Sequence, residues 1–415
     1  MRQPGDISVH LLGAVLVLAT APPLFAQSLF PAAGPPAIGV AADQKPEPVQ
    51  PPTPPEDLGF RFGGYVRSGF GDDSHGKGQQ PFMAPLAGAK YRLGNEAETY
   101  LETVFRYGAN TEGDNPGYFD TRLRLAYVTP TSQTSSFSTT FSLREAYVAA
   151  RRLWAAQPGA TFWAGARFYD RQDVHINDFY YRDPSGFGGG LEDVALGEHA
   201  KLAVAWIGGT QDELESNGVP APDQFRFNKN TYDVRFYDLP VGRSHASIAV
   251  DVSQFQGDTD FSRGEPIVVE DSLGASTTGI LETPFKGGRN KLALQYGKGA
   301  AYDFRSVVAI PEGRTLEPGE RVNVDDLWRF RVVNDLLLQQ RGPWALQAVV
   351  VWQEMDNGDA SNNRIRWVSA GARPVRRLGR FFSMAVEAGW DYTKQSDLPG
   401  GSLFKLTAAP QITPA

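Results

Sequence analysis

The chain has 415 residues, a formal net charge of −7 and no cysteine. An acidic balance argues against a nucleic-acid-binding protein, which needs a basic face. The absence of cysteine excludes disulfides, thiolate metal sites and a cysteine nucleophile. After the N-terminus, no stretch approaches the roughly 20 uninterrupted apolar residues of a transmembrane helix, so a helical membrane protein is excluded as well.

The N-terminal residues predict export from the cytoplasm. Arg2 is followed by an apolar run, Leu11 to Leu18, and by small residues that end at Ala26. This order is typical of a secretory signal peptide over residues 1–26. The alternative is an N-terminal anchor, but the apolar run is too short to cross about 30 Å of hydrocarbon as a helix.

A proline-rich stretch separates this leader from the rest of the chain. Residues 27–57 carry nine prolines and scarcely any large apolar residue, which predicts an extended or disordered linker. From Leu58 onward the sequence is rich in aromatics and glycines, without a second linker. We therefore expect one domain over residues 58–415.

Short runs in this domain alternate between apolar and polar residues. In Trp344–Trp352 the residues at period two are Trp, Leu, Ala, Val and Trp, whereas Gln347 is on the other face. In Phe382–Tyr392 the polar face carries Glu387 and Asp391, and a carboxylate in mid-strand must face water or a partner. Strands with an apolar face bounded by aromatics are typical of membrane β-barrels.

Alternation alone does not decide the fold class. In a soluble β-sandwich the same pattern turns the apolar face inward and the polar face outward. The Trp-bounded strands and the size of the single domain favour a barrel. A signal peptide without spanning helices leaves periplasmic, secreted and outer-membrane destinations, of which only the last requires a barrel.

Seven segments in chain order closely resemble the maltoporin family of sugar-specific porins. The match runs collinearly from Phe60 to about Ala409. The segments are Gly64–Gly69, Lys90–Tyr100, Tyr118–Thr121, Leu143–Ala146, Phe162–Tyr169, Arg171–Tyr181 and Gly371–Pro374.

The resemblance implies an all-β, transmembrane antiparallel β-barrel of the 18-stranded maltoporin type. It implies a homotrimer in the lipid of a Gram-negative outer membrane, facilitated diffusion of linear maltodextrin-type oligosaccharides, ion transport, no enzymatic activity, no cofactor and no metal. The family continues for about two strands beyond the position of Ala415. We therefore expect the last two strands to be missing and the strand near Tyr65 to lack its usual partner.

The resemblance also implies a sugar path through the barrel. Aromatic rings stack on the apolar faces of pyranoses, while charged side chains bind the hydroxyl rim. The aromatic path would comprise Tyr65, Tyr100, Trp367 and Phe137, and the constriction would be Tyr180. The polar track would comprise Arg67, Arg92, Glu102, Arg144, Asp173, His175 and Asp178.

Strand parity supports part of this path. Tyr65 shares parity with Arg67, and Tyr100 shares it with Glu102 and Arg92, so that each ring and its polar partner would face the same side. The plainer interpretation is that Arg and Tyr merely line a wet barrel.

The sequence departs from the family pattern in several places. The cysteines that clasp the first external loop fall at Pro81 and Ala97. The aromatic supplied by a neighbouring subunit has no clean match, and Phe137 is a substitute for it. A middle aromatic of the path, expected between Phe255 and Phe285, cannot be placed, and the last one would lie beyond Ala415.

Other chemistries fit the residues less well. Asp173, His175 and Asp178 could serve a glycosidase or a metal, but the segment is crowded with arginines and its spacing is a weak ligand pattern. Gly186–Gly190 lacks the Lys-Ser/Thr of a phosphate loop and favours a flexible hinge. A general, sucrose-type or acidic-polysaccharide porin and a soluble periplasmic sugar-binding protein stay open as alternatives. The carboxylate Glu102 counts against a polyanion pore.

Overall fold

The computed structural model describes residues 58–113, 116–130, 140–212, 226–261, 265–306, 317–339, 342–358 and 363–412. The predicted signal peptide (1–26) and linker (27–57) lie outside these ranges. Within the described ranges, no helix is both long and apolar enough to cross a membrane.

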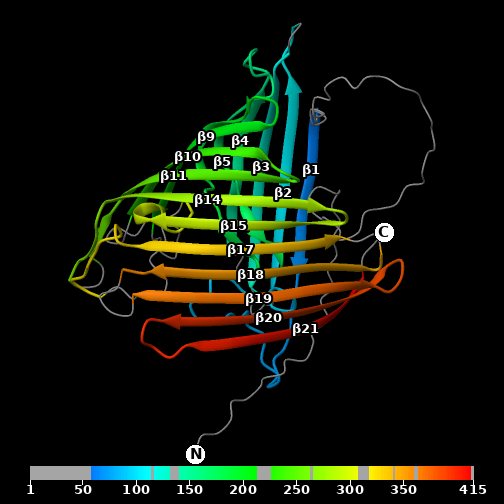
Figure 1. Cartoon of the computed structure of the whole chain (residues 1–415), viewed down its shortest axis with the longest axis vertical. Helices are drawn as coiled ribbons and strands as arrows, with labels where there is room; N and C mark the ends of the chain where they lie inside the picture. Colours follow the sequence, from blue (N-terminus) through cyan, green and yellow to red (C-terminus); the bar gives the residue numbers. More distant parts are fainter. Residues whose placement is uncertain are drawn as a thin grey trace, which may run out of the picture.

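Sixteen strands form one antiparallel sheet in which each strand pairs with the next one along the chain (Figure 1). The strands are β1 (Gly59–Ser68), β2 (Glu98–Asn110), β3 (Tyr118–Pro130), β4 (Thr140–Arg151), β5 (Thr161–Arg167), β8 (Gly186–Leu196), β9 (Ala200–Asp212), β10 (Arg226–Val241), β11 (Ser244–Gln256), β14 (Ser272–Phe285), β15 (Gly288–Lys298), β17 (Trp328–Gln339), β18 (Trp344–Asp356), β19 (Arg364–Arg377), β20 (Phe382–Gln395) and β21 (Gly401–Ile412).

The sheet is strongly curved. In Figure 1, β14 to β21 run across the front, whereas β1 and β2 run nearly at right angles to them behind. The predicted all-β antiparallel fold is confirmed, and the main sheet has 16 strands. No ladder joins β1 to β21 in the part of the chain that the structure describes.

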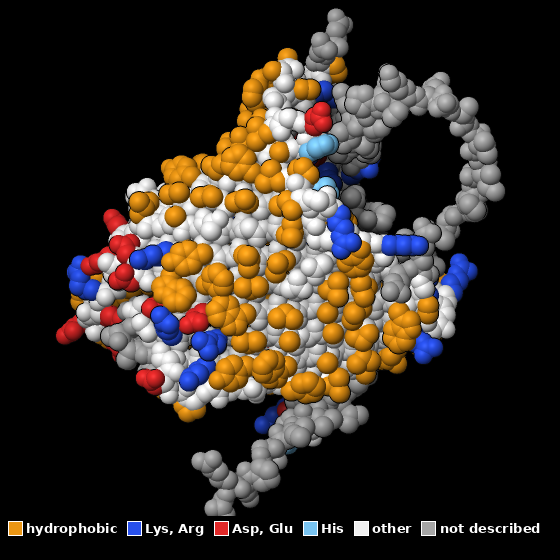
Figure 2. All heavy atoms as spheres, viewed as in Figure 1, with side chains coloured by type: hydrophobic (Ala, Val, Ile, Leu, Met, Phe, Trp, Pro, Cys, Tyr) orange, Lys and Arg blue, Asp and Glu red, His pale blue; other side chains and the backbone are white. Residues whose placement is uncertain are grey.

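The two faces of the sheet follow the predicted alternation. On β18, Val350 is 53% exposed, whereas the next residue, Val351, is fully buried. On β20, Trp390 is on the exposed face, whereas Glu387 and Asp391 are on the buried one. Figure 2 shows hydrophobic side chains over the middle of the exposed face of β14 to β21, with Asp, Glu, Lys and Arg gathered at the left end and several Lys and Arg at the right edge. This is the opposite of a soluble sandwich, whose apolar side chains would be inside.

Connections of two lengths alternate along the sheet. Residues 197–199, 242–243 and 286–287 form short turns at one end, whereas residues 69–97, 168–185 and 299–327 form long connections at the other. The long connections contain the remaining elements. These are β6 (Gln172–Val174), η2 (His175–Asn177), β7 (Phe179–Arg182), η3 (Gly299–Ala301) and β16 (Arg321–Val322), the last of which joins β12 (Asp258–Asp260) and β13 (Ile267–Val269) in a small sheet.

Two of these long connections fold against the inner face of the sheet. We call residues 69–97 the first connection and residues 168–185 the inward segment. Tyr91 of the first connection lies over Gly371 and Gly389, which are opposite each other on β19 and β20. A Cβ atom at either glycine would come within 2.2 Å of the Tyr91 ring, so only glycine leaves room for it. The Tyr91 hydroxyl is 2.9 Å from Ser369 Oγ.

Two local expectations were wrong. The parity assigned to Arg92 and Tyr100 implied a single strand over Lys90–Tyr100, but residues 90–97 belong to the first connection, because β2 begins only at Glu98. Gly186–Gly190 is part of β8 rather than a flexible hinge. Its glycines serve close packing, since a Cβ atom at Gly190 would lie 2.7 Å from Trp163 Nε1.

Candidate functional site

The inward segment crosses the interior as a small hairpin and is held to the wall through its backbone. β6 and β7 pair with each other, and the η2 turn between them ends at Asp178, which has a left-handed conformation with φ 55°. The carbonyl oxygen of Tyr181 accepts hydrogen bonds from Gln295 Nε2 at 3.0 Å and from Arg331 Nη1 at 2.8 Å. Two polar side chains of β15 and β17 therefore fix the end of the hairpin.

A buried ion network fastens the same hairpin to β10 and β11. Arg182 is fully buried, and its guanidinium reaches Asp170 at 2.8 Å, Asp233 at 2.6 Å and Asp251 at 2.5 Å. Burial alone would lower the pKa of Arg182, but Asp251 and the other two carboxylates raise it well above its ordinary value. Tyr169, also fully buried, donates its hydroxyl hydrogen to Asp233 at 2.6 Å.

Trp367, which was expected on the aromatic path, lies beneath the hairpin. Its ring is fully buried and meets the ring of Phe179 edge-on, with centroids 5.1 Å apart. Its Nε1 donates a hydrogen bond to Asp391 Oδ1 at 2.9 Å. In this conformation Trp367 supports the inward segment and offers no surface to a solute. The carboxylate of Asp391 has the partner that its mid-strand position required.

Four predicted residues meet on the inner face of β1 and β2. Tyr65 is opposite Glu102 in the strand register, and Arg67 is opposite Tyr100. The two tyrosine rings are 6.3 Å apart, and the Arg67 guanidinium lies 4.9 Å from the centre of the Tyr100 ring. The Tyr100 hydroxyl donates to Glu102 Oε1 at 2.5 Å. Tyr65 is 38% exposed, so this group is accessible from the interior.

The polar track continues onto β3 and β4. Arg124 donates to Glu102 Oε2 at 2.8 Å and to Glu145 Oε2 at 2.6 Å, which links the track across three strands. Arg144 is exposed and sits where a register irregularity interrupts the β3–β4 ladder. Its guanidinium is 5.8 Å from the ring of Phe168.

Arg92 reaches the track from the first connection. Its Nε is 2.7 Å from Glu96, and its Nη1 is 3.4 Å from Asp178 and 3.3 Å from His175 Nδ1. The predicted parity with Tyr100 does not explain this position, because Arg92 is not on the same strand. Instead, the Arg92 backbone N–H donates to the Ile176 carbonyl at 3.0 Å, which docks the first connection on the inward segment.

The charge on His175 depends on these neighbours. Enclosure by protein, followed by the positive charges of Arg92 and Arg373, lowers the pKa of His175 to about 4. Asp178 acts in the opposite direction but does not outweigh them. His175 is therefore a neutral hydrogen-bonding group at physiological pH.

Tyr180 and Asp173 face each other across the β6–β7 pair. Arg171, which the sequence-based list of site residues omitted, lies between two rings, 4.0 Å from the centre of Tyr180 and 4.1 Å from that of Phe168. Its Nε is 3.1 Å from Asp183 Oδ2. The Arg171–Gln172–Asp173 run could have suggested it, since charged residues at period two share one face of a strand.

Two further points concern the predicted residue Phe137 and a possible metal site. Phe137 lies outside the described residues. Within the described ranges, no group of three or more His, Asp or Glu side chains is arranged to hold a metal ion.

Comparison with known proteins gives one family match. A family model described as LamB porin matches residues 60–415. Among solved structures, the chain is similar to Salmonella typhi OmpF in its complex with daunomycin, with 11% identity, a TM-score of 0.45 and coverage of 84% of this chain and 96% of that one. It is also similar to the outer-membrane channel DcaP of Acinetobacter baumannii, with 12% identity, a TM-score of 0.49 and coverage of 85% and 95%.

Proposed function

The chain belongs to the LamB porin family, and from this premise we propose that it is a sugar-specific porin that passes linear maltodextrin-type oligosaccharides. It is an outer-membrane β-barrel protein of the porin type, and its family consists of channels. The proposal adds the substrate class, a Gram-negative outer membrane as the location and facilitated diffusion as the mechanism.

The observation that carries the proposal is the group formed by Tyr65, Tyr100, Arg67 and Glu102. Two neighbouring aromatic rings face the accessible interior, with a cation and a carboxylate beside them. A pyranose has apolar C–H faces and a rim of hydroxyl groups. Rings that contact the faces and charged groups that bind the rim give weak contacts in series, which allow a sugar to bind and also to leave.

The family also suggests how the protein would assemble and what else it would conduct. The protein would assemble as a homotrimer after removal of the signal peptide, and Phe137 would reach a neighbouring pore. The channel would also conduct ions and would need neither a cofactor nor an enzymatic step.

Single-channel conductance in planar bilayers tests the proposal directly. Block of the ion current should deepen from maltose to longer linear maltodextrins, because a longer chain occupies more contact points at once. Tyr100→Ala should weaken maltodextrin binding by about 1–3 kcal/mol, the range found for stacking on aromatic side chains.

Tyr107→Ala is the matched control. Tyr107 is on the same strand as Tyr100 but on the outer face, where it is 53% exposed. Its removal should leave sugar block unchanged. Equal block by sugars of every length would contradict the proposal, as would equal effects of the two substitutions.

A further inference from the structure

We propose that Glu387 is a positioning residue for the sugar path, because it holds the first connection and the inward segment at one point of the wall. This inference rests on the proposed sugar-porin function and adds a residue that shapes the path without touching the sugar. Glu387 is on β20, and its two partners, Arg373 and Lys405, are on β19 and β21. We call these three residues the Glu387 clamp.

The clamp is a buried carboxylate held by two cations. Glu387 is fully buried on the inner face of β20. Its Oε2 accepts a hydrogen bond from Arg373 Nε at 2.8 Å, and its Oε1 accepts one from Lys405 Nζ at 2.7 Å. A buried carboxylate is tolerated only when it is paired and hydrogen-bonded in this way. Glu387 therefore joins three neighbouring strands and has no surface left for a solute.

The clamp binds both backbone groups of Leu93 in the first connection. The Leu93 N–H donates to Glu387 Oε1 at 3.1 Å, and Lys405 Nζ donates to the Leu93 carbonyl oxygen at 2.6 Å. The next residue, Gly94, has φ 66°, and a Cβ atom there would lie 3.1 Å from Thr407 Cγ2 on β21. The first connection thus lies directly against the wall at the clamp.

The clamp binds the inward segment through the carbonyl group of Ile176. Arg373 Nη2 donates to this oxygen at 3.3 Å. The same oxygen accepts a hydrogen bond from the backbone N–H of Arg92 at 3.0 Å. The guanidinium can bind Glu387 and the carbonyl together because its donors are spread over a planar fork. The two interior segments therefore meet at one carbonyl group, and the clamp fixes that group to the wall.

Three residues of the predicted polar track depend on this attachment. Arg92 immediately precedes Leu93 in the first connection, and its Nη1 is 3.4 Å from Asp178. His175 immediately precedes Ile176 in the inward segment. A binding group has to be held within about 0.5 Å of its productive position to be effective. Loss of the clamp should therefore weaken the contacts of these three residues with the hydroxyl rim of a sugar.

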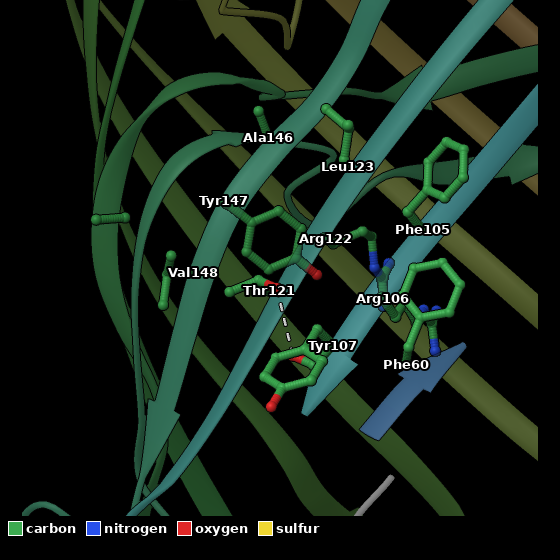
Figure 3. A pocket seen from close by; sticks show the side chains of 11 residues that line it. Phe60, Phe105, Arg106, Tyr107, Thr121, Arg122, Leu123, Ala146, Tyr147 and Val148 are labelled. Atoms are coloured by element: carbon green, nitrogen blue, oxygen red, sulfur yellow. Dashed lines mark hydrogen bonds between the residues drawn. The ribbon is translucent and has the colours of Figure 1, made fainter. Parts of the chain in front are cut away.

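The outer face of the sheet has a hollow that lies apart from the clamp. This hollow, about 280 Å³ in volume, is lined by β1 to β5 and is shown in Figure 3. Its exposed side chains, such as Tyr107 and Leu123, belong to the outer face, and the dashed line marks the hydrogen bond from Thr121 Oγ1 to the Tyr107 carbonyl oxygen. Among the described residues, the lining includes none from the clamp or from the two interior segments. A change at the clamp should therefore act on the interior and leave this hollow as it is.

Glu387→Gln tests the proposal, because it keeps the shape of the side chain and removes the charge that binds both cations. Single-channel recording should show a larger and noisier open-channel current, since both interior segments are released. Block of the current by maltohexaose should weaken about tenfold, as expected for the loss of one charge-assisted contact with the sugar.

Glu354→Gln is the matched control on the outer face of β18. Glu354 also lies between two cations, 3.4 Å from both Arg364 and Arg366. Its substitution makes the same change of charge outside the pore. It should change neither the open-channel current nor the block by maltohexaose.

Combination with Arg92→Gln separates positioning from a general loss of stability. If Glu387 acts through Arg92, Arg92→Gln should weaken block in the wild type but add little in Glu387→Gln, because substitutions within one network are not additive. A purely structural role would leave the two effects additive. Arg373→Lys keeps a cation beside Glu387 but loses the arm of the fork that reaches Ile176. It should also weaken block, and it replaces Glu387→Gln if that variant does not fold.

Unchanged block and current in folded Glu387→Gln or in Arg373→Lys would overturn the inference, as would additive effects in the double variant. Failure of maltohexaose to block the wild-type channel would instead count against the proposed function. The open-channel current of the variants would then decide whether the clamp holds the two interior segments.

Discussion

The inner face of the sheet differs between its two halves. On β1 and β2 the inner side chains are accessible, as Tyr65 at 38% exposure illustrates. On β10, β11 and β15 the corresponding polar side chains are covered, with Asp233, Asp251 and Gln295 each at most 3% exposed. The strands of both halves alternate in the same way. The inward segment covers the inner face at β10 and β11, where Arg182 binds Asp233 and Asp251.

Polar side chains on the inner face of the sheet therefore have two different roles. In the covered half, polar side chains bind protein, as Gln295 and Arg331 do at the Tyr181 carbonyl. In the open half, Tyr65 is 38% exposed and can contact a solute. Residues of the covered half should therefore affect stability and pore width, whereas those of the open half should affect which solutes bind.

The largest expected loss of stability comes from a substitution in the covered half. Arg182→Ala leaves the buried carboxylates of Asp233 and Asp251 without their shared cation, which should lower the free energy of unfolding by about 3–5 kcal/mol. It should also release the end of the inward segment and make the open-channel current larger and noisier. The measurements are denaturant unfolding in detergent and single-channel recording.

Arg144→Ala is the control, because Arg144 is an exposed cation on β4. Arg144 is exposed, so its removal should cost no more than about 1 kcal/mol. Equal losses of stability for the two substitutions would contradict the division of the interior into a covered and an open half.

The sequence predicts the strands better than it predicts this division. The alternation in Trp344–Trp352 and Phe382–Tyr392 identifies the two faces, because the period of a strand is a local property. The network around Arg182 could not be predicted in the same way. Its carboxylates Asp233 and Asp251 are on different strands and meet Arg182 only through the fold of the inward segment.

Local strand alternation also fails to predict the surroundings of Trp367. The resemblance led us to expect Trp367 on the sugar path, but neither the resemblance nor strand parity reveals that Phe179 covers its ring. By contrast, Tyr65, Arg67, Tyr100 and Glu102 are on adjacent strands, and their association follows from parity and register.

A smaller effect, on ion conductance and sugar discrimination, is expected at Tyr180. Tyr180 is on the inward segment, stacked on Arg171. Tyr180→Ala should raise the ion conductance and weaken the discrimination between sugars, because the ring would no longer narrow the pore. Tyr296→Ala, which removes a 45% exposed ring from the outer face of β15, should change neither. Unchanged conductance in Tyr180→Ala would place the constriction elsewhere.

The smallest expected effect concerns the charge on His175, which faces the open half. Because its pKa is lowered from 6.5 to about 4 in the folded protein, the unfolded chain binds this proton first as the pH falls. The contribution of neutral His175 to the free energy of unfolding should be complete above pH 6.5 and should decline between pH 6.5 and 4. We expect His175→Gln to reduce the loss of stability over this range, measured by urea unfolding at several pH values.

The ion selectivity of the channel should also be the same in the wild type and in His175→Gln between pH 8 and 5, because the imidazole of His175 stays neutral there. Identical pH dependence of unfolding in the two proteins would show that Arg92 and Arg373 do not hold His175 in its neutral form.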